Sequence, residues 1–203
     1  MSELRLPSAL IDFAIVCLTV IAINYSFYYA GLLFMSELFV SWSEYHYKIE
    51  QLAVQIYQSG WQFNQIVCIA KGGLRVGDIL CRLYEKPLAI MSATSYTGTD
   101  YRTRGTIQFS KHLSMTNDRV NVPILLVDDL VDSGVSLQES IDWLRSYTGN
   151  SSVEIRTATI WYKACSAIAP DYYVDYLPDN PWIHQPFELY EQTSLAELAQ
   201  RVQ

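Results

Sequence analysis

The sequence has few charges and few histidines. Only 17% of its residues are charged, it has 3 histidines, and its formal net charge is −7. This negative balance argues against nonspecific nucleic-acid binding, which depends on lysine and arginine neutralising phosphates. His46, His112 and His184 are scattered along the chain and show no spacing typical of a metal site. We therefore expect no nucleic-acid partner and no histidine-rich metal centre.

Paired cysteines are also lacking. Cys17, Cys68, Cys81 and Cys165 show no disulfide-like or zinc-like spacing, and three of them lie in apolar runs. We expect buried, free thiols in a reducing compartment, which favours a cytoplasmic protein. Half of the residues are hydrophobic, enough for the core of one domain of ordinary size plus an appendage.

One hydrophobic run stands apart from the rest. Residues 13–34 are uncharged and long enough to cross a bilayer as a helix. They end without a convincing cleavage site, which argues against a signal peptide. The letters MSEL occur at residues 1–4 and again at 35–38, so we expect the working domain to span residues 35–203. Residues 1–34 are then a membrane anchor, a non-native leader or an extra packed helix, and an anchor would leave the protein associated with the inner face of a membrane.

The most informative stretch is residues 123–137, PILLVDDLVDSGVSL. Residues 124–127 have the composition of a strand buried on both faces of a parallel sheet. Asp128 and Asp129 follow at the strand end, and a loop of small residues leads into a helix that should stop at Gly149. Such a unit is typical of a ligand site at the carboxyl end of a parallel strand.

The chemistry of this stretch points to a sugar phosphate. Backbone N–H groups and the hydroxyls of Ser133 and Ser136 would lie at a helix N-terminus, an arrangement that binds phosphate. Asp128 and Asp129 would repel that ligand unless they held ribose hydroxyls or a Mg²⁺ ion. We therefore expect a 5′-phosphate in the loop and sugar hydroxyls on the acidic pair.

The residues before this stretch predict two further units. Ser41 and Glu44 have capping-box spacing and begin a helix with an apolar stripe; its members are Tyr45, Ile49, Leu52 and Ile56. A buried strand at 65–70 is followed by Lys71, Gly72 and Gly73, and a helix at about 74–84. The glycines permit a strained turn or close approach of the backbone to a ligand, and the lysine suits an anion.

The residues on either side of the central stretch leave alternatives open. Residues 87–93 predict a strand, and 94–109 are either a solvated hairpin or a lid that excludes water. Residues 153–162 predict another strand, ending at Lys163. This lysine either points to solvent or donates to the edge of a planar base, with Trp182 stacking on its face. Ser194 and Glu197 predict a short terminal helix.

Several separated motifs resemble one family. Residues 123–137 resemble the PRPP-binding signature of type I phosphoribosyltransferases. Other segments are similar to bacterial xanthine-guanine phosphoribosyltransferases: MSELFVSW at 35–42, Ser95-Tyr96, Lys163, DYYVD at 171–175 and WIHQPF at 182–187. The resemblance implies an α/β fold, with a mostly parallel sheet flanked by helices and a small hood, here with an N-terminal apolar helix added.

The resemblance also implies roles for individual residues. Asp132 would be the catalytic base that accepts the purine N7 proton, and Asp129 the metal contact for Mg²⁺. The purine would lie against Asp132, Lys163, Trp182 and the backbone of Ile183. PRPP would be bound by Lys71, Gly72, Arg102, Asp128, Asp129, Asp132, Ser133, Gly134, Val135 and Ser136. The family often has arginine where this chain has Lys71, which keeps the charge but loses the bidentate fork, and Arg104 is a second candidate near Arg102.

The function predicted from this resemblance is transfer of ribose 5-phosphate from PRPP to a 6-oxopurine, with release of pyrophosphate, in purine salvage. The partners would be PRPP, a purine base and further copies of the chain in a homo-oligomer. Two other classes stay open: a regulatory protein on the same fold that binds PRPP or a nucleotide without turnover, and a membrane-anchored sensing protein.

Overall fold

The computed structural model describes residues 36–95 and 107–202. The chain divides into two units, Met1–Glu37 and Leu38–Gln203, and the elements from α2 onward all belong to the second. The predicted apolar segment at 13–34 lies outside the described residues. Among the helices of 36–95 and 107–202, none combines the length and the apolar character that a bilayer crossing needs.

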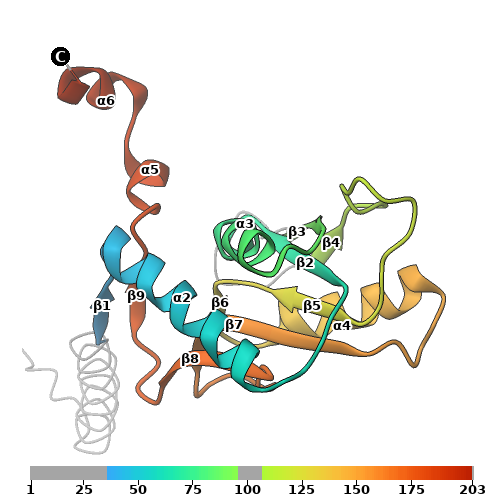
Figure 1. Cartoon of the computed structure of the whole chain (residues 1–203). Helices are drawn as coiled ribbons and strands as arrows, with labels where there is room; N and C mark the ends of the chain where they lie inside the picture. The colour runs from blue at the N-terminus through green and yellow to red at the C-terminus, as the bar shows by residue number, and fades with distance from the viewer. Residues whose placement is uncertain (1–35, 96–106, 203) are drawn as a thin grey trace, which may run out of the picture. The chain divides into compact units, whose positions relative to one another are not determined.

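A mostly parallel, seven-stranded sheet forms the centre of the domain (Figure 1). Its strands run in the order β4-β3-β2-β5-β7-β6, with β8 also paired to β7. Among the described strands of this sheet, only β3 and β4 pair in antiparallel fashion. The strands are β2 (Gln65–Ala70), β3 (Leu88–Ser95), β4 (Ile107–Phe109), β5 (Ile124–Val127), β6 (Leu130–Val131), β7 (Ile155–Lys163) and β8 (Tyr172–Leu177).

The acidic pair interrupts what would otherwise be one strand. β5 and β6 both pair with β7, and Asp128 and Asp129 lie between them. The backbone carbonyl of Asp129 accepts hydrogen bonds from the N–H groups of Ile160 and Trp161 on β7, at 3.0 and 3.1 Å. This local break in the ladder holds the two carboxylates at the end of β5, where the sequence predicts them.

Helices cover both faces of the sheet. Alternate residues of β2 and β5 belong to two different core clusters, as expected for strands buried on both sides. One cluster includes side chains of α2 (Trp42–Gln58) and α3 (Gly73–Tyr84), and the other includes side chains of α4 (Val135–Thr148). Figure 1 shows α2 and α3 across the sheet from α4.

The predicted helix signals are confirmed. Ser41 and Glu44 form the complete capping box at the start of α2, and Gly149 caps the end of α4 with φ of 65°. The predicted stripe of α2 is fully buried. Ser194 and Glu197 likewise exchange hydrogen bonds at the start of α6 (Leu195–Val202), which follows the short helix α5 (Leu189–Gln192).

A small two-stranded sheet carries the residues that follow β8. It consists of β1 (Glu37–Phe39) and β9 (Trp182–His184). The N–H of Val40 donates to the carbonyl of His184 at 3.0 Å, and the Ile183 side chain is buried in the cluster beneath α2. The segment after β9 is therefore anchored to the main domain at its start.

The prediction for the cysteines is only half right. Cys68, Cys81 and Cys165 are free thiols, as expected, but only Cys68 is buried. Cys81 faces partly outward from α3, and Cys165 is exposed in the loop after β7. Cys17 lies outside the described residues.

Candidate functional site

Two loops meet at the carboxyl ends of adjacent parallel strands. β2 and β5 pair in register from Gln65 with Ile124 to Cys68 with Val127. The turn of Lys71, Gly72 and Gly73 follows β2, while Asp128 and Asp129 follow β5. Because parallel strands end at the same edge, the cationic turn and the acidic pair become neighbours.

The two glycines allow the β2 turn to touch the acidic pair. A Cβ atom on Gly72 would lie 2.2 Å from Oδ1 of Asp129, and one on Gly73 would lie 2.5 Å from the carbonyl oxygen of Val127. Gly72 has ordinary right-handed helical angles, φ −55° and ψ −51°. These positions therefore need glycine for close approach, and the approach is to Asp129 and its strand.

The acidic pair is held in a defined geometry. Oδ1 of Asp128 accepts the backbone N–H of Asp129 at 2.9 Å. Oδ2 of Asp129 accepts the side-chain amide of Gln185 at 2.6 Å. Burial raises the pKa of both carboxyls, and the neighbouring Asp129 charge raises that of Asp128 further. Within the described residues neither carboxylate forms an ion pair.

The loop before α4 leaves most of a helix N-terminus open. Gly134, the N-cap residue, has φ of 81° and no side chain to cap the helix, and Oγ of Ser133 accepts the N–H of Val135 at 3.5 Å. The carbonyl of Ser133 accepts a hydrogen bond from Ala167 N at 3.0 Å, and a Cβ atom on Gly134 would lie 2.5 Å from Oγ of Ser166. The loop therefore packs closely against the segment after β7. This packing positions the first N–H groups of α4 so that they can bind an anion.

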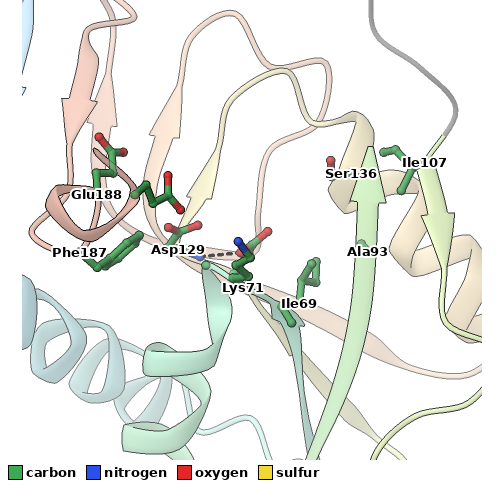
Figure 2. A pocket seen from close by; sticks show the side chains of 12 residues that line it. Ile69, Lys71, Ala93, Ile107, Asp129, Ser136, Phe187 and Glu188 are labelled. Atoms are coloured by element: carbon green, nitrogen blue, oxygen red, sulfur yellow. Dashed lines mark hydrogen bonds between the residues drawn. The ribbon is translucent and has the colours of Figure 1, made fainter. Parts of the chain in front are cut away.

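The turn after β2, the acidic pair and Ser136 in the first turn of α4 line one pocket of about 320 Å³, whereas the loop residues 132–134 are not part of its wall. Figure 2 shows Ser136 and Ile107 on one side, Lys71 and Asp129 in the middle, and Glu188 on the other side. Of the predicted PRPP-binding residues, the pocket includes Lys71, Gly72, Asp128, Asp129 and Ser136. Phe187, Glu188 and Glu191 also line the pocket, although the sequence predicted no role for them.

The predicted base and the predicted purine lysine are also neighbours. Nζ of Lys163 lies 3.6 Å from Oδ1 of Asp132, and the lysine side chain is only 8% exposed. The prediction that Lys163 could point to solvent is therefore wrong: its side chain is buried at the end of β7. The thiol of Cys165 donates to the same Asp132 oxygen at 3.3 Å.

The remaining purine-contact candidates lie on β9. The N–H of Cys165 donates to Oδ1 of Asn180 at 2.8 Å, so the loop that touches Asp132 also touches the turn before Trp182. Trp182 is 53% exposed, whereas Ile183 is 4% exposed. The indole is free to stack on a ligand, and Ile183 can offer only its backbone.

Some site residues escaped prediction from the sequence. Gln185 and Phe187 belong to the segment that resembles the family, but no role was given to them. Cys165, two residues after Lys163, was expected only to be a free, buried thiol. The predicted arginines Arg102 and Arg104, and most of the predicted lid, lie outside the described residues. Where the residues are described, β3 and β4 pair in antiparallel fashion, which fits both the hairpin and the lid.

Comparison with known proteins agrees with this geometry. Residues 41–192 match the family described as phosphoribosyl transferase domain. Among solved structures, the chain is similar to a purine phosphoribosyltransferase from Pyrococcus horikoshii, with 24% identity, a TM-score of 0.59, and coverage of 75% of this chain and 94% of that one. It is also similar to the xanthine-guanine-hypoxanthine phosphoribosyltransferase of Helicobacter pylori, with 20% identity, a TM-score of 0.64, and coverage of 77% and 96%.

A third similar structure is a protein from Neisseria gonorrhoeae with bound ppGpp. Its identity is 18%, its TM-score is 0.59, and the match covers 82% of this chain and 94% of that one. At these identities the three likenesses establish the fold, while the family match covers most of the chain and includes every loop of the pocket. The chain therefore belongs to the phosphoribosyl transferase domain family and has the type I phosphoribosyltransferase fold.

Proposed function

We propose that the protein transfers ribose 5-phosphate from PRPP to a ring nitrogen of a 6-oxopurine, such as xanthine, guanine or hypoxanthine, and releases pyrophosphate. The observation that carries this proposal is the contact between Asp132 and Lys163. Asp132 belongs to the phosphate loop, and Lys163 ends β7, whose following loop contacts Asn180, two residues before the exposed Trp182. Their proximity supports a single site that serves a sugar phosphate and a flat base together.

The sugar phosphate would occupy the pocket between the two loops. The open N-terminus of α4, with Ser133 and Ser136, would bind the 5′-phosphate, because N–H groups and the helix dipole both attract an anion. Asp128 and Asp129 would accept hydrogen bonds from the ribose hydroxyls. Lys71 and the backbone at Gly72 would bind the pyrophosphate.

The acidic pair also fits Mg²⁺. Asp129 is buried and Asp128 is partly buried, and neither forms an ion pair with a described residue. Such a pair suits an ion that takes one or two carboxylates plus substrate oxygens and water. No group of three candidate metal-ligand side chains occurs in residues 36–95 and 107–202, so PRPP and water would complete the set. Asp129 is the proposed protein contact, and the ion would neutralise charge on the departing pyrophosphate.

The base would lie between Trp182 and the contact of Asp132 with Lys163. Trp182 would stack on the ring, Lys163 would donate to the 6-oxygen, and the backbone of Ile183 would face the 2-substituent. Both side-chain contacts of Asp132 fall on Oδ1. Within the described residues this leaves Oδ2 to take a proton.

Bond changes then follow from this arrangement. The bond from C1 of the ribose to the pyrophosphate oxygen breaks, a bond from C1 to the purine nitrogen forms, and the N7 proton passes to Asp132. The contacts of Lys163 and Cys165 hold the acceptor carboxylate against the base. Pyrophosphate leaves with the electron pair of the broken bond.

A purine panel tests the proposal. The full chain is incubated with PRPP, Mg²⁺ and one of xanthine, guanine, hypoxanthine or adenine, and both nucleotide and pyrophosphate are measured. We expect equal amounts of the two products with the 6-oxopurines and little of either with adenine, whose 6-amino group cannot accept from Lys163. Failure of every 6-oxopurine to react would refute the proposed activity.

A second candidate is a regulatory protein that binds PRPP or a nucleotide without turnover. The similar Neisseria structure contains ppGpp, a guanine nucleotide with two groups of phosphates. Binding of ppGpp or PRPP by calorimetry, with no product in the purine panel, would favour this function. The contact of Asp132 with Lys163 supports the enzyme instead, because phosphate binding alone does not require it.

We also propose that the transferase domain begins near Met35 and acts as a homo-oligomer. The capping box at Ser41 and the family match from residue 41 support this boundary. Expression from Met35 should yield a soluble, active protein, and an insoluble or inactive product would contradict the boundary. Cell fractionation tests the membrane-anchored alternative, which predicts recovery in the membrane pellet.

A further inference from the structure

Gln185 contacts the acidic pair from a distant part of the chain. Its Nε2 donates to Oδ2 of Asp129 at 2.6 Å, across a separation of 56 residues, and each residue is only 8% exposed. An amide N–H that donates to a carboxylate forms a charge-assisted hydrogen bond, which is stronger than one between two neutral groups. The contact joins the segment after β9 to the end of β5.

The backbone around Gln185 is anchored by hydrogen bonds on both sides of this residue. The carbonyl of His184 accepts from Val40 N, and the carbonyl of Gln185 accepts from Glu188 N, both at 3.0 Å. The neighbouring Ile183 side chain is buried in the core. Gln185 is therefore fixed by contacts on both sides of it in the sequence, as a preorganised donor should be.

Asp129 is confined on two sides. Gly72 lies so close to Oδ1 that a Cβ there would be 2.2 Å away, and the Gln185 amide contacts Oδ2. A carboxylate only accepts hydrogen bonds, so the amide must turn its nitrogen toward Asp129. The turn and the amide together define one position for this carboxylate.

Packing alone does not account for an amide at this position. Oε1 of Gln185 is buried and has no hydrogen-bond partner among the described residues. A half-satisfied buried amide is less favourable than an apolar side chain of the same shape. What the amide offers that an apolar side chain cannot is the N–H group on Asp129.

We propose that Gln185 is a positioning residue, which holds the Asp129 carboxylate for the ribose hydroxyls of PRPP and ties it to the strand carrying Trp182. This inference rests on the proposed function. It differs from that function in assigning a role to a residue that touches neither base nor phosphate. One short segment would then serve both halves of the site, with Trp182 on the base and Gln185 behind the sugar.

A pair of matched variants tests the assignment. Gln185→Met keeps the volume and removes the N–H group. Gln65→Met is the control, because Gln65 is also a buried glutamine whose Oε1 has no partner, and its Nε2 donates to a backbone carbonyl, that of Pro87, at 2.8 Å. Gln65 begins β2, at the opposite end of that strand from the site.

The PRPP dissociation constant is measured by calorimetry with Mg²⁺ present, alongside KM for PRPP, KM for the base and the melting temperature. We expect Gln185→Met to raise the dissociation constant and KM for PRPP about 10- to 100-fold, as is usual for loss of a residue that supports a binding group. The KM for the base should change much less. Gln65→Met should leave PRPP binding within about twofold of wild type, because Pro87 is outside the site, and its melting temperature reports any change in stability.

Unchanged PRPP binding in Gln185→Met, or an equal loss in both variants, would overturn the assignment. If Gln185→Met does not fold, Gln185→Asn is measured instead, since it keeps an amide that is too short to reach Asp129. Wild-type protein that neither binds nor consumes PRPP would refute the proposed function itself. The two failures are therefore distinguishable.

Discussion

Gly72→Ala is a sharp test of how the two loops cooperate. The backbone angles of Gly72 suit alanine, so the change adds one methyl group and no backbone strain. That methyl would lie 2.2 Å from Oδ1, 2.5 Å from Cγ and 2.7 Å from Oδ2 of Asp129. All three close contacts are with one side chain, which has to move.

The size of the movement follows from these distances. Ordinary van der Waals contact begins at 3.4 Å, so Oδ1 must retreat by about 1 Å from its present 2.2 Å. Gln185 donates to Oδ2 of the same carboxylate at 2.6 Å, so a movement of about 1 Å also disturbs that hydrogen bond. A misplacement of about 1 Å typically costs about 100-fold in rate, which corresponds to about 2.7 kcal/mol.

The assay is kcat/KM for PRPP, with Gly77→Ala as the matched control. A Cβ on Gly77 would lie 2.8 Å from Cβ of Cys68, a smaller overlap than at Gly72 but one inside the core and away from the pocket. Both variants should lose about 1–3 kcal/mol of stability through overpacking. Only Gly72→Ala should lose about 100-fold in kcat/KM for PRPP. An equal loss in the two variants would refute the reasoning, because it would trace the defect to stability.

Three further predictions concern the charged groups. Asp132→Asn should lower kcat far more than it weakens PRPP binding, because it removes the proton acceptor; equal losses in both would make Asp132 a structural residue. Lys163→Met should raise KM for a 6-oxopurine by about tenfold or more through loss of a charged donor, and an unchanged KM for the base would contradict the proposed contact. Burial and the Asp129 charge raise the pKa of Asp128 above its ordinary value of 3.8, so its contribution to stability is full below that value and is lost as pH rises through the folded-state pKa. Asp128→Asn should therefore flatten the fall in melting temperature of the metal-free protein with rising pH, and a curve parallel to wild type would count against this.

Local patterns in the sequence predict most of the elements that build the site. The strands predicted at 65–70 and at 124–127 have those same bounds in the structure. A short run of branched apolar residues, with strand-ending residues on both sides, is most readily buried as a strand. The capping box at Ser41 is an equally local signal. The two glycines after β2 indicated close backbone approach, although not what the backbone approaches.

Contacts between distant segments could not be predicted in this way. The sequence contains no local signal that Gln185 meets Asp129, or that Cys165 and Lys163 meet Asp132 across about thirty residues. These contacts depend on the pairing of β5 and β6 with one side of β7, and on the anchoring of β9 to β1. Charge alone suggested a solvent-facing alternative for Lys163, and its burial follows from its position at the end of a strand covered by neighbouring segments.

The sequence by itself therefore determined which residues end the strands and begin the helices, because those choices depend on neighbours a few positions away. The tertiary structure decided which of those ends share a pocket, since strand order brings together loops that the chain separates by more than fifty residues. It also decided what surrounds the acidic pair, with Gly72 against the carboxyl group of Asp129 and Gln185 donating to its Oδ2.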